Sequence, residues 1–188
     1  MKTIFKLIPI AVIATLTMAF STPVKEKVAI TSSQINWKGE KVTGTHTGTI
    51  ALKSGYFLME NNQLTGGMFV VDMTSITVTD LDGGMKTKLE GHLKSDDFFG
   101  VNNYPEATLT ITDVAKKGEA YKVTANLKIK ENTHPIHFTL AMSNGKATTN
   151  LKIDRSKYDV RYGSKSFFDN LGDRTIMDIF ELDITLNF

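Results

Sequence analysis

The residues best placed for chemistry lie in the segment EGHLKSDDFFG, residues 90–100, which holds His92, Asp96 and Asp97 within six positions. On a helix, a histidine and a carboxylate four residues later share a face, and such a pair can bind a metal ion or transfer protons. The same letters also fit a capped helix end. Ser95 can cap a short turn that begins with the two aspartates, where the backbone dipoles favour negative charge. This structural interpretation explains every residue of the segment without catalysis, and we prefer it.

Other groups of reactive residues are weaker. His134 and His137 are three positions apart in a segment with strand-like alternation, so their side chains point to opposite faces and cannot chelate one ion. The chain has no cysteine and no Gly-x-Ser-x-Gly motif of a serine nucleophile. The sequence therefore predicts no metal site, no cofactor and no enzymatic activity.

The first residues have the layout of a secretory signal peptide. Lys2 and Lys6 precede an uncharged apolar run from Leu7 to Phe20, and small residues follow. We expect a signal peptide over residues 1–21, a single mature domain over residues 22–188, and export. Without the two leader lysines the chain has 20 basic and 20 acidic residues. This balance gives no indication of a nucleic-acid partner.

The elements that must position any site are mainly strands, because from Lys25 onward apolar and polar residues alternate with a period of two. Turn signals separate the alternating runs at KKGEA (116–120), ENTHP (131–135) and SNGK (143–146). One exception is GGMKTKLEGHL, in which Met85, Leu89 and Leu93 share a helical face. We expect strands near residues 31–38, 41–52, 56–60, 64–72, 106–114, 121–130, 135–143, 146–155 and 177–187. Strands with one apolar face must close into a barrel or pack on a second sheet, and the pattern predicts an all-β, antiparallel barrel of about eight strands with a short helical insert.

The predicted strand over 41–52 suggests what the barrel interior contains. Its apolar face carries Gly44, His46 and Gly48, and if this face points inward the two glycines leave volume in the barrel wall. His46 would then offer a hydrogen bond to a ligand head group, unless a neighbouring strand already pairs with it. On other strands Leu127, Phe138 and Leu140 belong to the apolar face, as core or as the wall of a pocket.

A second candidate region is the segment DRSKYDVRYGSKSFFDNLGDR, residues 154–174, which mixes cations with aromatic residues. At a barrel mouth, Arg161 could meet an anionic head such as a diphosphate while Phe168 covers the tail, since the planar guanidinium group suits phosphate. Four aspartates interleave with the cations, however, and a solvated loop whose charges pair with one another is the simpler interpretation.

Four segments of the mature chain carry a family resemblance: SITVTDLDGGMKTKLEGHLKSDDFFGVNNYPEATLTITDV (75–114), VTGTHTGTIALKSG (42–55), IKENTHPIHFTL (129–140) and the segment from Ile153 to Phe188. Through these segments, most of the mature chain resembles the YceI-like family of polyisoprenoid-binding periplasmic proteins. The block HLKSDDFF…NNYPEATL is its most specific part. The turn KENTHPI departs from the common pattern, in which many members carry a glycine between the strand and the threonine.

The resemblance implies a lipocalin-like barrel in the periplasm whose interior holds a long apolar lipid of polyisoprenoid or acyl type. The expected partner is a long-chain lipid or isoprenoid, with transient membrane contact and with no nucleic acid; the oligomeric state stays open. The residues expected to contact the ligand are Gly44, His46, Gly48, His92, Phe98, Phe99, Leu127, Phe138, Leu140, Arg161 and Phe168. Two alternatives are an enzyme acting on a small hydrophobic substrate through His46 or His92, and a structural or interaction barrel with a filled core.

Overall fold

The computed structural model describes residues 25–188, so the predicted signal peptide lies outside the described residues. Within them a nine-stranded antiparallel sheet is joined by one α-helix and two short 3₁₀ helices. The elements are β1 (Glu26–Ala29), β2 (Ser32–Lys41), β3 (Gly44–Glu60), β4 (Gln63–Val78), α1 (Gly83–Lys94), β5 (Glu106–Lys117), β6 (Ala120–Ile129), β7 (Asn132–Ser143), β8 (Lys146–Asp154), η1 (Arg155–Tyr158), η2 (Gly172–Arg174) and β9 (Ile179–Asn187).

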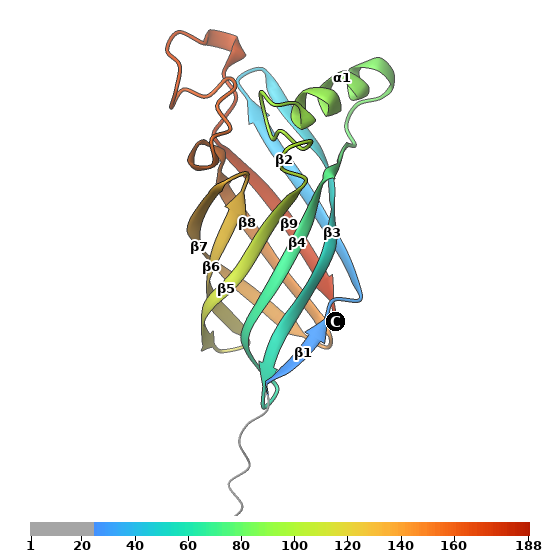
Figure 1. Cartoon of the computed structure of the whole chain (residues 1–188), viewed down its shortest axis with the longest axis vertical. Coiled ribbons are helices and arrows are strands. Elements are labelled where there is room, and N and C mark those ends of the chain that lie inside the picture. Colours follow the sequence, from blue (N-terminus) through green and yellow to red (C-terminus); the bar gives the residue numbers. More distant parts are fainter. Residues whose placement is uncertain (1–24) are drawn as a thin grey trace, which may run out of the picture.

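Eight of the strands close into a barrel (Figure 1). The order β3-β2-β9-β8-β7-β6-β5-β4 returns to its start because β3 also pairs with β4, while β1 adds to the second half of β3. The pairing of β2 with β9, in which Ile35 lies opposite Ile184, joins the two ends of the domain. Closure satisfies the backbone groups that an open sheet would leave at its edges. The predicted fold class, an antiparallel barrel of about eight strands with a helical insert, is confirmed.

The turns follow from residues that tolerate a left-handed backbone. Asn144 and Gly145, at φ of 51° and 72°, join β7 to β8 as an Asn-Gly hairpin does. Between β6 and β7 the turn consists of Lys130, which has φ of 54°, and Glu131, because β7 already begins at Asn132. The turn predicted over ENTHP (131–135) therefore lies further toward the N-terminus than expected.

Two further expectations about the strands were wrong. The segments 41–52 and 56–60 form one long strand, β3, whose pairing with β4 shifts register between Leu52 and Ser54. An irregularity of this kind bends a strand without ending it, whereas the sequence suggested a break. The short strand β1 was not predicted, because four residues are too few for a clear alternation.

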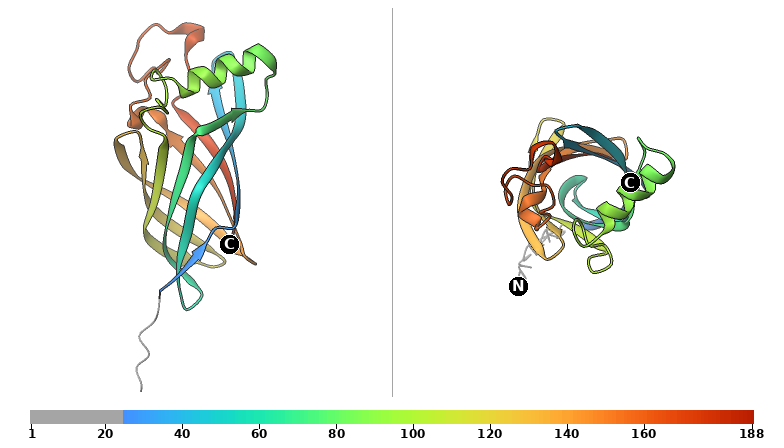
Figure 2. Two further views of the ribbon diagram at one scale, coloured as in Figure 1. Left: turned by 45° about the vertical axis from the view of Figure 1, so that its right-hand side comes forward. Right: turned by 90° about the horizontal axis from the view of Figure 1, so that it is seen from above.

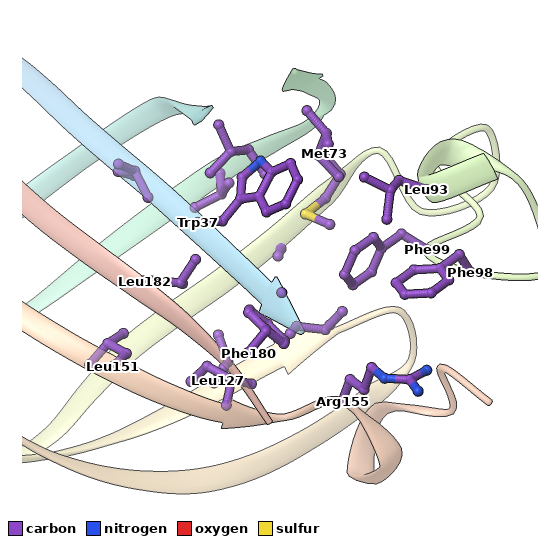
Figure 3. Close-up of a pocket in the computed structure, with 18 of the residues that line it drawn as sticks. Trp37, Met73, Leu93, Phe98, Phe99, Leu127, Leu151, Arg155, Phe180 and Leu182 are labelled. Carbon is purple, nitrogen blue, oxygen red and sulfur yellow. The ribbon is translucent and has the colours of Figure 1, made fainter. Parts of the chain in front are cut away.

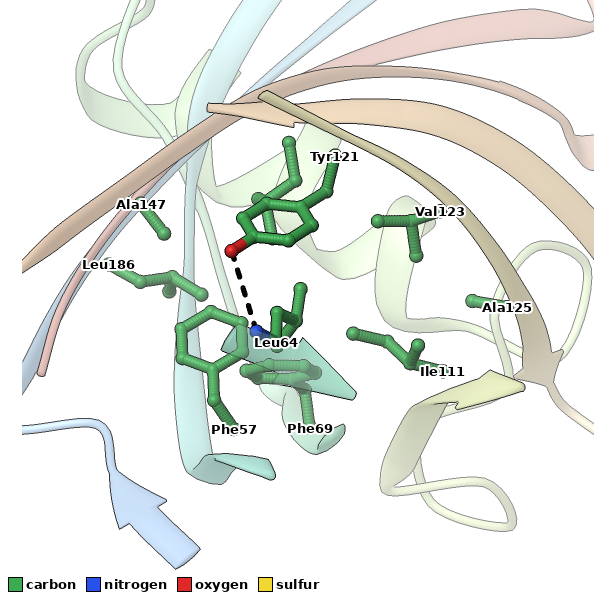
Figure 4. Close-up of a cluster of buried hydrophobic side chains, with 10 residues drawn as sticks. Phe57, Leu64, Phe69, Ile111, Tyr121, Val123, Ala125, Ala147 and Leu186 are labelled. Carbon is green, nitrogen blue, oxygen red and sulfur yellow. Dashed lines mark hydrogen bonds between the residues drawn. The ribbon is translucent and has the colours of Figure 1, made fainter. Parts of the chain in front are cut away.

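The barrel end away from α1 is filled with side chains. A buried cluster there includes Phe57, Leu64, Phe69 and Tyr121, and the Leu64 amide donates to the Tyr121 hydroxyl at 3.5 Å (Figure 4). The ring of Phe57 packs edge-on against Phe69 and Phe188, each with a centroid distance of 5.2 Å. Aromatic packing of this kind closes the floor of the barrel.

The other end is covered by irregular structure. Helix α1 and the 155–178 segment between β8 and β9 lie over this end, beside the β2–β3 turn (Figures 1 and 2). Helix α1 has no buried residue, so it lies across the barrel and is not part of the core. Its attachment includes the Glu90 carboxylate, which accepts a hydrogen bond of 2.8 Å from the Val78 amide at the end of β4.

Candidate functional site

The barrel encloses a cavity of about 700 Å³ between the aromatic floor and α1. Its wall receives apolar side chains from strands all around the barrel, among them Trp37 on β2, Met73 on β4, Leu127 on β6, Leu151 on β8 and Leu182 on β9 (Figure 3). The size lies within the roughly 300–1,000 Å³ of typical ligand sites. An apolar space this large offers burial to a hydrophobic ligand and very few hydrogen bonds.

The cavity opens at the α1 end. Its exposed lining residues belong to the β2–β3 side, to α1 and to the 155–178 segment, and they are Glu40, Lys41, Met85, Lys88, Tyr162, Asp173, Arg174 and Met177. At the floor, by contrast, the lining residues Phe57, Leu140 and Leu186 are buried. The cavity is therefore accessible from solvent past α1 and closed at the floor.

Arg155 is the principal polar group at this mouth, and it is 2% exposed. It donates hydrogen bonds of between 2.9 and 3.2 Å to the backbone carbonyl oxygens of Met177, Val160, Tyr162 and Ile176. Its Nη2 also lies 3.2 Å from Asp178 Oδ1, and its guanidinium carbon lies 5.3 Å from the centre of the Phe98 ring. Burial lowers the pKa of Arg155, while the charges of Asp178 and then Asp154 oppose that effect. The guanidinium group holds the loop in shape and has its donors engaged by protein carbonyls.

His46 lies at the rim of the cavity and is bound to Asp80. Its Nδ1 is 2.8 Å from Asp80 Oδ2, and the Thr47 amide donates to the other carboxylate oxygen at 2.9 Å. Burial raises the pKa of Asp80, but these two hydrogen bonds outweigh it and leave the pKa below its usual value. His46 does line the cavity, as predicted, although its Nδ1 is already hydrogen-bonded to Asp80, which lies just beyond the end of β4.

His92 also lines the cavity, near the end of α1. Its ring packs edge-on against Phe98 and Tyr162 at centroid distances of 5.6 and 4.4 Å, and its Nε2 is buried without a hydrogen-bond partner. The expected capping role of Ser95 was wrong. The Ser95 hydroxyl donates a hydrogen bond of 2.7 Å to the His92 carbonyl oxygen and so caps the C-terminal end of α1. It does not cap the turn that contains Asp96 and Asp97.

The glycines of β3 do not leave the open volume expected of them. A Cβ atom on Gly48 would lie 1.9 Å from the Thr77 carbonyl oxygen and 2.4 Å from the Trp37 ring. The indole of Trp37 thus occupies the space beside Gly48, and its Nε1 donates a hydrogen bond of 3.2 Å to the Thr49 carbonyl oxygen. Gly44 lies in the exposed start of β3 with nothing within 4 Å of such an atom, and neither glycine belongs to the cavity wall.

The two candidates from the 154–174 segment also lie off the wall. The Arg161 side chain is 60% exposed, pairs with Asp159 and stacks on Phe167. Phe168 is 49% exposed. The alternative of a solvated, self-paired loop describes Arg161 better than a phosphate contact does.

Seven of the eleven predicted contact residues therefore line the cavity: His46, His92, Phe98, Phe99, Leu127, Phe138 and Leu140. Gly44, Gly48, Arg161 and Phe168 do not, and contact with a ligand stays a prediction for all of them. Sequence reasoning misses Trp37, Met73 and Leu151, which also line the wall. Their signal was the alternation itself: Trp37 follows the inward Ile35 by two.

Two kinds of site are not found in the described part of the chain. Within residues 25–188, no three His, Cys, Asp or Glu side chains are grouped as ligands of a metal ion. In the same residues, no helix has both the length and the apolar character needed to cross a bilayer.

The fold has close structural relatives. BcnA of Burkholderia cenocepacia superposes with a TM-score of 0.63 and 19% identity over 82% of this chain and 94% of its own. A polyisoprenoid binding domain from Saccharophagus degradans gives a TM-score of 0.59 and 18% identity over 85% and 95% of the two chains. At such identities the likeness establishes the fold alone.

Sequence comparison adds the family. A UPF0312 protein of Photorhabdus laumondii is 47% identical over 45 residues, which are 24% of this chain and 23% of that protein. Protein YceI of Escherichia coli is 36% identical over 62 residues, 33% and 32% of the two chains. These alignments span only a quarter to a third of the curated relatives. The model of the YceI-like domain, however, matches residues 27–188, and since this is nearly all of the part that the structure describes, the chain belongs to the YceI-like domain family.

Proposed function

We propose that this protein is a non-enzymatic carrier that binds one long apolar lipid, of polyisoprenoid or acyl type, inside the barrel. The observation that carries the proposal is the apolar cavity of about 700 Å³, closed at the floor and open beside α1. Burial contributes about 0.8 kcal/mol per methylene, so ten buried methylenes contribute about 8 kcal/mol toward binding without any polar contact, against which the loss of freedom of the bound chain must be set.

Two observations favour this function over the alternatives. A barrel with a purely structural role would be expected to fill its core, and this one does not. The enzyme alternative would have to use the two histidines on the cavity wall: His46, whose Nδ1 is engaged by Asp80, and His92, whose ring packs against Phe98 and Tyr162. The family likeness to a domain described as polyisoprenoid-binding supports the choice of ligand class. The leader-like residues 1–21 support a periplasmic location, which fractionation of cells would test.

The chain contains a single tryptophan, and Trp37 lines the cavity, so its fluorescence reports on occupancy. We expect long-chain lipids brominated along the acyl chain to quench Trp37 in a saturable way. The variant Ala107→Phe places a large ring on the inner wall and should weaken binding at least about tenfold, because it removes space that the chain needs. Its matched control is Ala141→Phe, on an exposed position of β7, which should bind as the wild type does.

The experiment separates the candidates. Lack of quenching with any long-chain lipid, or equal affinities for the two variants, would refute the carrier proposal. Mass spectrometry of protein purified under native conditions should show a co-purifying lipid. Turnover of such a lipid that is lost in His46→Ala or His92→Ala would point to the enzyme instead.

A further inference from the structure

The exposed large apolar side chains are not spread evenly over the molecule. Of the eight found among residues 25–188, seven belong to segments at the mouth of the cavity: Val42, Met85, Tyr162, Phe167, Phe168, Met177 and Ile179. The eighth, Met68, lies on the outer face of β4. We call the seven the apolar rim. Scattered single apolar residues are normal on a surface, but a concentration around one opening marks an interaction site.

The apolar rim is built from three segments that hold one another in place. The β2–β3 turn carries Val42, whose amide donates a hydrogen bond of 3.1 Å to the Thr175 carbonyl oxygen. The Met177 amide donates a hydrogen bond of 2.8 Å to the Glu40 carbonyl oxygen at the end of β2. The 155–178 segment is tied in turn to α1, where the His92 ring meets Tyr162. Seen from above, α1, the turn and this segment surround the opening of the barrel (Figure 2). The segments that carry the rim side chains thus surround the mouth.

Cations accompany these apolar side chains. Over residues 39–44, 83–94 and 155–179, the rim segments hold nine basic residues against six acidic ones. The basic residues are Lys41, Lys86, Lys88, Lys94, Arg155, Lys157, Arg161, Lys165 and Arg174, and the acidic ones are Glu40, Glu90, Asp159, Asp169, Asp173 and Asp178. Three of the acids pair with cations of the same segments: Asp178 with the buried Arg155, Asp159 with Arg161 and Glu90 with Lys86. Long basic side chains beside exposed aromatic ones are typical of surfaces that enter the interface of a bilayer, where the rings reach the acyl boundary and the cations meet head groups.

We propose that the apolar rim docks on the surface of a lipid bilayer, with the mouth of the cavity facing the membrane. This inference rests on the proposed function, because it describes how the ligand moves: the chain of a lipid passes from the bilayer into the barrel between α1 and the 155–178 segment without crossing water. Continuity of the rim with the apolar cavity favours a bilayer over a protein partner. A protein interface would need a contiguous packed core. Here the apolar groups belong to a turn, a helix end and a loop that surround the mouth of the cavity, so they do not form such a core.

The test is binding to vesicles by flotation, with phosphatidylcholine alone and with added phosphatidylglycerol. The wild type should float with both and more strongly with the anionic vesicles, since the rim segments hold three more basic than acidic residues. The double variant Val42→Ser/Phe167→Ser removes two rim side chains that do not line the cavity, and its vesicle affinity should fall at least about tenfold. Met68→Ser is the matched control, because it removes an exposed apolar side chain away from the mouth, and its binding should be unchanged.

A second measurement keeps this inference separate from the proposed function. Uptake of a short-chain fluorescent acyl probe in solution depends on the cavity and needs no membrane, so Val42→Ser/Phe167→Ser should take it up normally. Normal uptake with no vesicle binding by the wild type would overturn membrane docking and leave the carrier function standing. Equal vesicle binding by the double variant and the wild type would overturn it too, as would a rim-dependent dimer in sedimentation analysis in place of vesicle binding. No uptake by any of the proteins would refute the carrier function itself.

Discussion

At the scale of single residues, Arg155 and Arg161 differ in almost everything except their type. Arg155 is buried and donates to four carbonyl oxygens of the loop around it, whereas Arg161 is mostly exposed beside Asp159. The sequence offers Arg161 as a candidate ligand contact because it lies among aromatic residues, beside the simpler interpretation of a self-paired loop, but only the folded loop shows which guanidinium group the carbonyls surround. The direction of backbone carbonyl groups cannot be inferred from local composition, so the sequence alone could not identify Arg155 as the arginine that they surround.

The two arginines give a first prediction. Arg155→Met leaves four carbonyl oxygens without their donor and Asp178 without its positively charged partner, and we expect the free energy of unfolding to fall by about 3–5 kcal/mol. Arg161→Met removes an exposed ion pair with Asp159 and the exposed stacking on Phe167, and should change the free energy of unfolding by about 1 kcal/mol or less. Urea denaturation of both variants measures the difference. Similar losses for the two would mean that the carbonyl oxygens around Arg155 find water or other donors.

Tyr158 gives a second prediction, which concerns alkaline pH. Burial, and secondly the charge of Asp154, raise the pKa of Tyr158 to about 12, while an unfolded chain has the ordinary value of about 10. Between these values the unfolded state releases a proton that the folded state keeps, so stability is present below pH 10 and falls as the pH rises toward 12. The loss should reach about 3 kcal/mol. In Tyr158→Phe this part of the pH dependence should vanish in urea titrations at pH 9 to 11.5; parallel curves for the two proteins would contradict the assignment.

At the scale of elements, β2, β3 and β4 meet at Gly48 more closely than any side chain permits. The alternation in β3 correctly predicts that this face is apolar and turned inward, with Ile50 and Leu52 on the cavity wall. It does not predict that the indole of a paired strand lies over the glycine, because that contact depends on register across the sheet. The same holds for α1: spacing predicts the helix, but its place across the barrel mouth depends on Glu90 and the loop contacts.

A third prediction belongs to this contact. Gly48→Ala places a methyl group within 1.9 Å of the Thr77 carbonyl oxygen, so strands β3 and β4 must separate, and we expect a loss of about 2–4 kcal/mol in unfolding free energy. Gly39→Ala is the control, since nothing lies within 4 Å of the new atom. Its stability should stay the same or rise by up to about 1 kcal/mol, because alanine restricts the unfolded chain. Equal unfolding midpoints for the two variants would show that the strands yield at little cost.

At the scale of the whole molecule, the fold follows largely from the sequence, and the cavity does not. Alternating runs and turn residues predict a barrel of about eight strands, and closure is the general way to remove the edges of such a sheet. Whether the inward residues meet at the centre depends on the tilt and stagger of all strands together, which no local pattern contains. The alternation thus correctly predicts that Leu127 and Phe138 point into the barrel. Whether they line a cavity or fill a solid core depends on the geometry of the complete barrel.

The closed floor leads to a last prediction. A chain that enters at the mouth can extend only as far as Phe57 and Leu140, so a series of fatty acids from eight to eighteen carbons should stabilise the protein with increasing length and then reach a plateau. Each added methylene contributes about 0.8 kcal/mol while it is buried and almost nothing once it projects beyond α1. At one fixed ligand concentration, about a hundred times the dissociation constant of the longest chain that is fully buried, the rise in melting temperature should be about 5–10 °C for that chain and smaller for shorter ones. Calorimetry across the series measures both the slope and the plateau, and the longest chains are decisive: if stabilisation keeps rising through eighteen carbons without a break, the closed floor does not limit chains of this length, and the prediction is wrong.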